Sequence, residues 1–303
     1  MWHNRCTMHQ DLREQMEKTL QHRYSACMFD FDGTLIERGY HMPVPTYISE
    51  ILQKVSREVP MALCTTRPFA DAIKHAHELF GVYFEEMKPR WTWFCESGSA
   101  GYSFDESTNS FVELYRVPWP QNLTDRTHFE MLIRETFPEN LPTMTVHESV
   151  IILRPNGYER MSAEAMNEAA SELQKKGLAL LRDHGLDDVI RLGNSSLGVF
   201  FFCPEGDKNR GTLEFGKLLR SRGFDLGDEL REIILFGDRP MPFGNDEHFL
   251  NGELGTPVNV GELQIDRNNL TSVIDDVGER LMGPRATEYL LRKLRFKTAF
   301  KNM

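Results

Sequence analysis

Three short apolar runs in this 303-residue chain show no alternation with polar residues, and each ends at a charged, hydroxyl or glycine residue. They span residues 26–29, 61–64 and 233–236. A strand whose successive side chains are all apolar must be covered on both faces, because neighbouring side chains point to opposite sides. The runs therefore predict three strands of a mostly parallel sheet that needs helices above and below it.

Helical periodicity occupies the segments between these runs. Apolar residues recur at helical spacing within 46–56, and Pro68 suits the first turn of a second helix over 68–80. A third helix is predicted for 208–221. Buried strands that alternate with helices indicate an α/β protein with a three-layer α/β/α, Rossmann-like core.

The middle of the chain shows a different pattern, because its shorter apolar runs include alternating ones that suit antiparallel strands with one exposed face. Strands are predicted there at 111–116, 143–147, 149–153, 188–192 and 198–203, and helices at 125–136 and 162–176. A chain of 303 residues also exceeds what one hydrophobic core usually organises. We therefore predict a core made of residues 1–103 and 206–303, with an α+β domain inserted at 104–205.

Charge and cysteine usage limit the partners and the compartment. The formal net charge of −10 disfavours a general nucleic-acid binder, which needs a positive surface. Four of the five cysteines lie in apolar, strand-like runs, as expected of buried thiols in a reducing compartment. The N-terminal residues hold no apolar stretch, and no run is long enough to span a bilayer. We expect a cytoplasmic protein without nucleic-acid or membrane partners.

Polar side chains follow or adjoin the predicted strands. The first strand is followed by Asp30 and Asp32, the second by Thr65 and the third by Asp238, while Lys208 opens a predicted helix. Ligands of open parallel sheets bind outside the carboxyl ends of the strands, so these side chains are expected to converge. Paired carboxylates at a buried strand end need a positive partner, and magnesium prefers such oxygen ligands. We therefore predict a Mg²⁺ site at Asp30, Asp32 and Asp238.

This set of side chains suits phosphoryl transfer. Asp30 would attack phosphorus and form an aspartyl-phosphate. Asp32 would protonate the leaving oxygen and then activate the group that attacks the intermediate. Thr65 can donate a hydrogen bond to a phosphoryl oxygen. Lys208, at a helix N-terminus, can hold both the Asp30 carboxylate and the phosphoryl group.

The order of these motifs resembles the haloacid-dehalogenase-like superfamily. DxDGTL stands at 30–35, a threonine and a lysine follow, and a GD…ND segment closes the set at 237–246. By this resemblance the nucleophile is Asp30, the acid/base is Asp32, the phosphate ligands are Thr65 and Lys208, and a metal ligand is Asp238. The resemblance also implies that the backbone carbonyl of Asp32 binds the magnesium ion.

The predicted insertion is similar to the C2-type caps of this superfamily, because it lies between the threonine and lysine motifs. We expect the C2B subtype. The segment 94–98 resembles the ENG segment that leads into such caps, with Ser97 replacing the usual Asn.

Further side chains are candidates around this centre. Arg154 and Asn156 are predicted substrate contacts from the cap, because a guanidinium suits a second anionic group on the substrate. The predicted core contacts are Thr66 and Arg67, and the residues expected just behind the metal ligands are Asn245 and Asp246.

Two subfamilies share parts of the pattern. The 237–246 segment has the length of the final motif of eukaryotic-type phosphomannomutases, GDKTxPGGND. The segment 65–68 reads TTRP, which is closer to the TGRP of sugar-phosphate phosphatases than to the mutase GGSD, and no SPIGR segment is present. We therefore expect a phosphatase for a phosphorylated sugar or similar small metabolite. The alternative is a hexose phosphomutase, and a non-catalytic binding protein is disfavoured by the intact set of motif residues.

Overall fold

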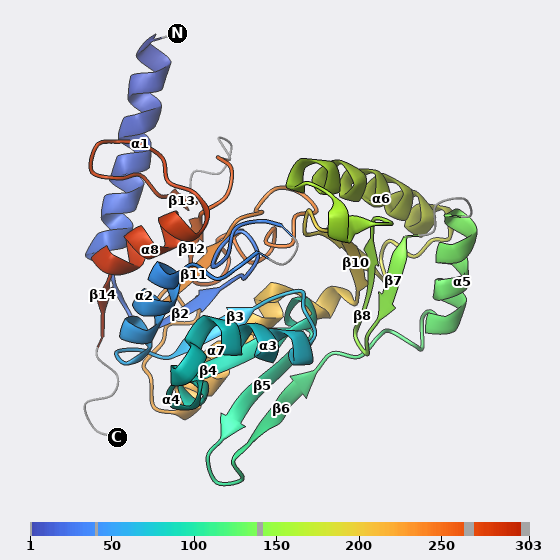
Figure 1. The fold of residues 1–303 in the computed structure, drawn as a ribbon, viewed down its shortest axis with the longest axis horizontal. Helices are drawn as coiled ribbons and strands as arrows, with labels where there is room; N and C mark the ends of the chain where they lie inside the picture. Colours follow the sequence, from blue (N-terminus) through green and yellow to red (C-terminus); the bar gives the residue numbers. More distant parts are fainter. Residues whose placement is uncertain (1, 40–41, 138–141, 264–269, 298–303) are drawn as a thin grey trace.

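The computed structural model describes residues 2–39, 42–137, 142–263 and 270–297, with residues 2–10 described by their backbone alone. Its largest feature is an eight-stranded sheet (Figure 1). In spatial order the strands are β13 (Thr271–Ser272), β12 (Thr256–Asn259), β11 (Ile233–Gly237), β2 (Ala26–Phe29), β3 (Met61–Cys64), β4 (Trp91–Cys95), β5 (Ala100–Asp105) and β6 (Ser110–Arg116). The first six are parallel to one another, and the β5–β6 hairpin is antiparallel.

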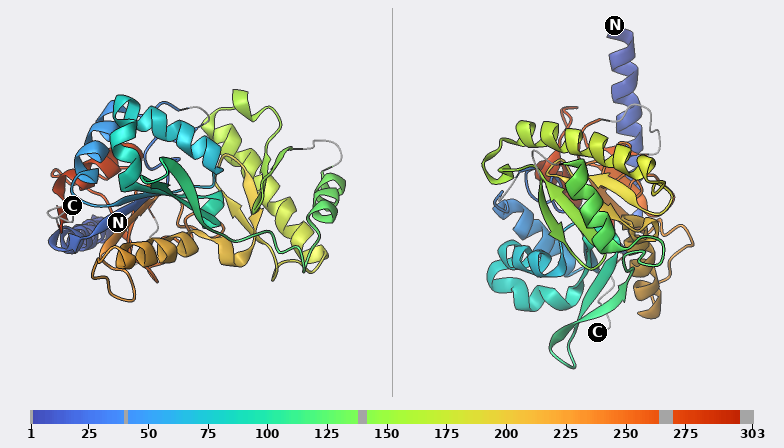
Figure 2. Two further views of the ribbon diagram at one scale, coloured as in Figure 1. Left: turned by 90° about the horizontal axis from the view of Figure 1, so that it is seen from below. Right: turned by 90° about the vertical axis from the view of Figure 1, so that its right-hand side faces the viewer.

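The parallel part of the sheet is buried on both faces, as the absence of alternation predicts. In β2, Cys27 and Phe29 face one hydrophobic cluster while Ala26 and Met28 face another. The first cluster includes side chains of α2 (Thr46–Ser56), α3 (Phe69–Phe80) and α8 (Gly283–Lys293), and the second includes side chains of α7 (Lys208–Ser221). Figure 2 shows the helices on either side of the sheet. The three-layer α/β/α core is therefore confirmed.

The N-terminus of α7 is formed by local sequence. Asp207 lies just before the helix, and its side chain accepts a hydrogen bond from the backbone N–H of Arg210 at 3.1 Å. Such capping satisfies one of the backbone donors that a helix start leaves unpaired. It makes Lys208 the first residue of α7, directly at the carboxyl edge of the sheet.

A second, four-stranded antiparallel sheet lies to the right in Figure 1. Its spatial order is β7 (Thr143–Val146), β8 (Val150–Arg154), β10 (Val199–Phe202) and β9 (Arg191–Asn194). The helices α5 (Arg126–Thr136) and α6 (Ala163–Asp183) share a hydrophobic cluster with one face. A separate buried cluster consists of Val150, Ile152, Phe200 and Phe202. These strands and helices form an α+β module, and α6 is longer than expected.

One predicted strand belongs to a different sheet from the one expected. The sequence pattern places the strand at 111–116 in the inserted domain, but β6 pairs with β5 at the edge of the large sheet. Its Phe111 packs edge-on against Trp93 of β4, with ring centroids 5.1 Å apart, which attaches the hairpin to the core. The predicted boundary at residue 104 falls inside β5. We propose that the inserted domain begins after Arg116 instead.

The remaining elements lie around the core. The helix α1 (Trp2–Gln21) extends away from it in Figure 1, and a small parallel pair joins β1 (Arg23–Tyr24) to β14 (Arg295–Phe296). Short helical elements are α4 (Phe84–Met87), η1 (Gly81–Tyr83), η2 (Lys88–Arg90), η3 (Glu96–Gly98), η4 (Tyr158–Arg160) and η5 (Pro204–Gly206). Among the described residues, no helix has the combined length and apolar character that a membrane crossing requires.

Candidate active site

Strand register brings the predicted residues to one edge of the large sheet. Phe29, the last residue of β2, pairs with Phe236 of β11 on one side and with Leu63 of β3 on the other. Because these strands are parallel, Asp30 and Asp238 leave the sheet at the same edge. Thr65, which follows β3 on the other side of β2, leaves at that edge too.

Lys208 bridges two buried carboxylates. Its Nζ donates hydrogen bonds of 2.6 Å to Asp30 Oδ1 and of 2.6 Å to Asp246 Oδ1. The exposed fraction is 1% for Lys208, 2% for Asp30 and 0% for Asp246. Although burial alone would lower it, the two carboxylates raise the pKa of Lys208, so the ammonium is charged. This buried ion pair is the electrostatic centre of the site.

Asp246 also fixes the loop that carries the other acidic residue. Its Oδ2 accepts the backbone N–H groups of Asp238 at 2.9 Å and of Arg239 at 3.0 Å. With Oδ1 bound to Lys208, both carboxylate oxygens are in use. The sequence predicts a place for Asp246 behind the metal ligands, and these contacts support a role in holding them.

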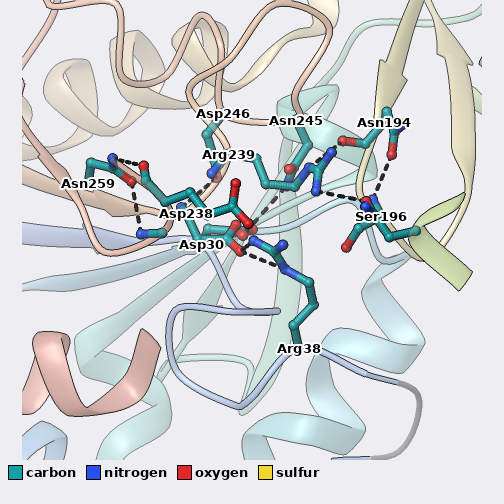
Figure 3. Close-up of polar contacts among 12 residues, drawn as sticks. Asp30, Arg38, Asn194, Ser196, Asp238, Arg239, Asn245, Asp246 and Asn259 are labelled. Carbon is teal, nitrogen blue, oxygen red and sulfur yellow. Dashed lines mark hydrogen bonds and ion pairs between the residues drawn. The ribbon is translucent and has the colours of Figure 1, made fainter. Parts of the chain in front are cut away.

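Asp238 faces Asp30 across the site (Figure 3). Burial raises the pKa of Asp238 to about 6, and the Arg38 guanidinium opposes that shift. Arg38 Nε donates to Asp238 Oδ2 at 3.1 Å, and Arg38 Nη2 forms an ion pair with the same oxygen. The chain must approach closely here, because Gly33 has φ +80° and a Cβ on it would clash with Asp238 Oδ2.

The acidic cluster has the donor set of a divalent-cation site. Asp30, Asp238 and Asp246 each offer an oxygen atom within 4.8 Å of the others, and together they form the metal-capable acidic group of the described residues. Oδ1 of Asp238 is buried and has no hydrogen-bond partner among those residues. Burial, with the neighbouring Asp246 adding to it, raises the pKa of Asp30 well above its usual range. A bound cation would oppose this shift and satisfy the unpaired oxygen.

The Asp32 side chain lies outside that acidic group. Its carboxylate is held by Arg67, which donates from Nη2 to Oδ1 at 2.7 Å and from Nε to Oδ2 at 3.1 Å. This arrangement therefore does not favour metal binding by the Asp32 side chain. The backbone carbonyl of Asp32 stays the predicted metal ligand.

Asp32 borders a pocket between the large sheet and the α+β module. The core contributes Asp32, Thr66 and Arg67 to its lining, and the module contributes Arg154 and Phe200. Three of the four predicted substrate contacts therefore share one pocket with the predicted acid/base. The fourth, Asn156, is exposed and is not among the described residues that line it.

Thr65 and Asn245 complete the predicted set. Thr65 is buried, and its Oγ1 accepts the backbone N–H of Arg67 at 3.2 Å, so it also orders the turn after β3. Asn245 Nδ2 donates to Asp30 Oδ2 at 3.5 Å, the limit of a hydrogen bond. The Asn245 Oδ1 atom is buried and unpaired among the described residues.

Contacts that the sequence did not predict join the module to the acidic loop. Asn194, at the end of β9, donates its N–H to the carbonyl of Phe243 at 2.7 Å. The Asn194 carbonyl in turn accepts Arg239 Nε at 3.1 Å and the backbone N–H of Asn245 at 3.2 Å (Figure 3). The loop that carries Asp238 is thus bonded to the core and to the module. The sequence feature that could have indicated these contacts is the position of Arg239 inside the 237–246 motif.

No protein-family model and no curated protein matches this chain. Among solved structures, IMP-nucleotidase of Plasmodium falciparum aligns with a TM-score of 0.60 and 15% identity, covering 92% of this chain and 68% of that one. The C-terminal domain of trehalose-6-phosphate phosphatase from C. albicans gives a TM-score of 0.60 and 12% identity, covering 92% and 94%. A haloacid dehalogenase-like hydrolase from Bacteroides thetaiotaomicron gives 0.51 and 16%, covering 80% and 90%.

Two of these alignments cover 92% of this chain, which is more than the large sheet and its helices alone. The chain has the haloacid-dehalogenase-like fold. Identities of 12–16% support a common fold and leave the chemistry to be argued from the site. In this haloacid-dehalogenase-like fold, the buried Asp30–Lys208–Asp246 cluster lies at the carboxyl edge of the parallel strands, where ligands of open α/β sheets bind.

Proposed function

We propose that this protein is a magnesium-dependent phosphatase that hydrolyses a phosphorylated sugar or a similar small metabolite. The observation that carries the proposal is the buried Lys208 ammonium, 2.6 Å from Asp30, beside a metal-capable acidic group. A nucleophilic carboxylate next to a fixed cation suits phosphoryl transfer, in which catalysis is mainly positioning and charge stabilisation.

In the first step Asp30 takes up the phosphoryl group. A carboxylate oxygen of Asp30 forms a bond to phosphorus while the bond from phosphorus to the substrate oxygen breaks. Asp32, protonated on one oxygen while Arg67 stays bonded to the other, gives its proton to that leaving oxygen, which departs as an alcohol. Lys208 stays bonded to Asp30 and balances negative charge on the phosphoryl oxygens.

In the second step water releases the phosphate. Asp32, now a carboxylate, accepts a proton from a water molecule as the water oxygen attacks phosphorus. The bond between phosphorus and Asp30 breaks, so inorganic phosphate leaves and the Asp30 carboxylate is restored. Asp32 ends the cycle protonated, which is the form that the next turnover needs.

The residues present fit a magnesium ion. Asp30, Asp238 and the backbone carbonyl of Asp32 would hold it, with Asp246 fixing the loop behind them. When bound, the ion neutralises charge on the phosphate and on the acidic cluster. The buried Oδ1 of Asp238 has no hydrogen-bond partner among the described residues, and the ion would supply one.

Arg38 is expected to compete with magnesium for Asp238. The Arg38 guanidinium binds Asp238 Oδ2, and the Arg38 side chain is 27% exposed. Magnesium can therefore displace this ion pair, because partly exposed pairs are weak. Arg38→Gln should bind Mg²⁺ roughly fivefold more tightly, equivalent to about 1 kcal/mol for one partly exposed ion pair. The measurement is the rise of Tm during a Mg²⁺ titration.

Arg57→Gln is the matched control for this titration, because Arg57 pairs with Glu86 on the exposed surface. It should leave the magnesium midpoint unchanged. Weaker Mg²⁺ binding by Arg38→Gln would show that Arg38 supports the ion instead of competing with it.

The substrate proposal is supported by the pocket beside Asp32. Arg67 lines it from the core, and Arg154 lines it from the module. Two guanidinium groups at a pocket wall favour a ligand with polar or anionic groups besides the transferred phosphate. The solved neighbours include proteins named for IMP and for trehalose 6-phosphate, both phosphorylated small molecules. We propose that the module is a C2B-type cap, because it lies between Thr65 and Lys208 in the sequence, as in the caps that the sequence resembles.

Arg154→Ala is expected to raise KM about tenfold and to change kcat little. A charge-assisted hydrogen bond to substrate that is equally strong in the ground and transition states affects binding alone. Steady-state kinetics on the preferred substrate measure this. Arg160→Ala, at an exposed position in the same segment, should have no effect. An unchanged KM for Arg154→Ala would exclude Arg154 from the substrate site.

A hexose phosphomutase is the second candidate. It is favoured by the 237–246 segment, whose length and Gly-Asp…Asn-Asp ends are similar to the phosphomannomutase motif. In that reaction Asp30 would return the phosphoryl group to another hydroxyl of the sugar instead of to water. The two candidates differ in one requirement, since a mutase depends on a bisphosphate activator.

The test is a phosphate-release assay with Mg²⁺ on a panel of hexose monophosphates, trehalose phosphate, nucleoside monophosphates and p-nitrophenyl phosphate. The proposal expects turnover of at least one alkyl phosphate that is abolished by EDTA. Isomer interconversion that needs a bisphosphate would identify a mutase. A complete lack of turnover would favour a non-catalytic binding protein.

A cytoplasmic location remains our prediction, and it fits the four buried free cysteines.

A further inference from the structure

His75 of α3 stands directly behind the predicted acid/base. Its side chain is buried on the face of α3 toward the core, with 8% of the residue exposed. The Nε2 atom lies 2.9 Å from Arg67 Nη1, and Nδ1 lies 2.9 Å from Glu78 Oε2. No sequence motif joins this histidine to Arg67, so the fold alone reveals this contact.

The partners determine the protonation of the ring. A guanidinium can only donate hydrogen bonds, so His75 Nε2 must be the acceptor and carry no proton. His75 Nδ1–H therefore donates to the Glu78 carboxylate. Burial, together with the charge of Arg67, lowers the pKa of His75, which favours the neutral ring. The charged groups around it are Arg67, Glu78 and Asp32, and the Phe31 ring packs against it at 5.0 Å.

Arg67 connects this histidine to the acid/base. Two of its nitrogens bind the two oxygens of Asp32, and the third binds His75. Its guanidinium also lies over the Phe31 ring, 5.5 Å from the centroid. With all three nitrogens bonded and one face covered, the guanidinium plane is fixed, and that plane sets the plane of the Asp32 carboxylate.

We propose that His75 is a positioning residue for the phosphatase reaction, because it holds Arg67 in the orientation that aims Asp32 at the leaving oxygen. The inference rests on the proposed function. His75 touches neither the substrate nor the reacting atoms, and Asp32 alone gives and accepts the proton in the two steps. Glu78 acts one step further back, by keeping the ring in the tautomer that accepts from Arg67.

A positioning role makes a prediction that a purely structural role does not. An alkyl alkoxide leaves poorly without a proton, whereas p-nitrophenolate leaves as a stable anion. Misaligning Asp32 should therefore slow alkyl phosphates selectively. For His75→Leu we expect kcat/KM, which reports the first phosphoryl transfer and not the later attack of water, to fall about tenfold on the fastest alkyl phosphate of the panel and less than about twofold on p-nitrophenyl phosphate.

Two further variants separate alignment from packing. His75→Gln can still accept a hydrogen bond from Arg67 through its amide oxygen, so it should recover most of the alkyl-phosphate activity. His77→Gln, on the exposed side of the same helix, should behave as wild type on both substrates. Equal losses on both substrates, or no loss in His75→Leu, would overturn the proposal.

Glu78→Ala tests the same series of hydrogen bonds at its outer end. The Glu78 side chain is 47% exposed, so the substitution should not impair folding. It should show a smaller but equally selective loss of activity on the alkyl phosphate. An unchanged preference between the alkyl phosphate and p-nitrophenyl phosphate would also overturn the proposal. A wild-type enzyme without turnover on the panel refutes the proposed function and this inference together. A working wild type with unselective variants refutes the inference alone.

Discussion

Asp30→Asn is expected to abolish phosphatase activity, with kcat reduced at least about 10⁴-fold and the fold intact. The amide nitrogen and oxygen of Asn cannot form a stable acyl-phosphate, so the first step of the reaction has no nucleophile. The substitution preserves the volume of a side chain that is 2% exposed, and it removes a charge whose burial is unfavourable. Phosphate release is the measurement, with Tm recorded in EDTA to show that stability is retained.

The control for Asp30→Asn is the same change at an exposed aspartate. Asp228→Asn, in the segment between α7 and β11, should retain wild-type kcat because Asp228 is exposed to solvent. Mass spectrometry of wild-type enzyme quenched during turnover should find a phosphoryl adduct on the peptide that contains Asp30. An Asp30→Asn enzyme that keeps more than about a tenth of wild-type kcat would refute the nucleophile assignment.

Much of the core could be predicted because its signals are local. The strands β2, β3 and β11 are apolar on both faces, and few structures besides a doubly covered strand produce this pattern. Parallel strands in register then bring Asp30 and Asp238 to one edge whatever their separation in sequence. The start of α7 at Lys208 was predictable for a similar reason, since Asp207 is a capping residue.

The rest depended on pairings between distant residues. Alternation identified β6 as a strand, but alternation cannot say which sheet a strand joins, and Phe111 packs on the core. The contact of Arg38 with Asp238 and the contact of His75 with Arg67 join segments whose spacing carries no motif. The folded chain also separates Asp32 from the acidic group, because Arg67 holds its carboxylate in another direction.

Lys208→Met is expected to lower the free energy of unfolding by about 3–5 kcal/mol in the absence of metal. The ammonium is 1% exposed and bonds two carboxylates, so its removal leaves Asp30 and Asp246 buried without their cation. Methionine fills a similar volume, so the loss reports charge rather than a cavity. Urea unfolding in EDTA measures the change. Lys217→Met, at a side chain in the same helix that is 62% exposed, should stay within about 0.5 kcal/mol of wild type.

The double variant Lys208→Met/Asp30→Asn shows whether electrostatics cause this loss. If the instability of Lys208→Met comes from uncompensated buried charge, neutralising Asp30 should recover roughly 1–3 kcal/mol, the coupling typical of residues in direct contact. Strict additivity of the two substitutions would mean that Lys208 stabilises the fold through packing alone. A Lys208→Met protein as stable as wild type would contradict the buried ion pair, and with it the electrostatic basis of the proposed phosphoryl transfer.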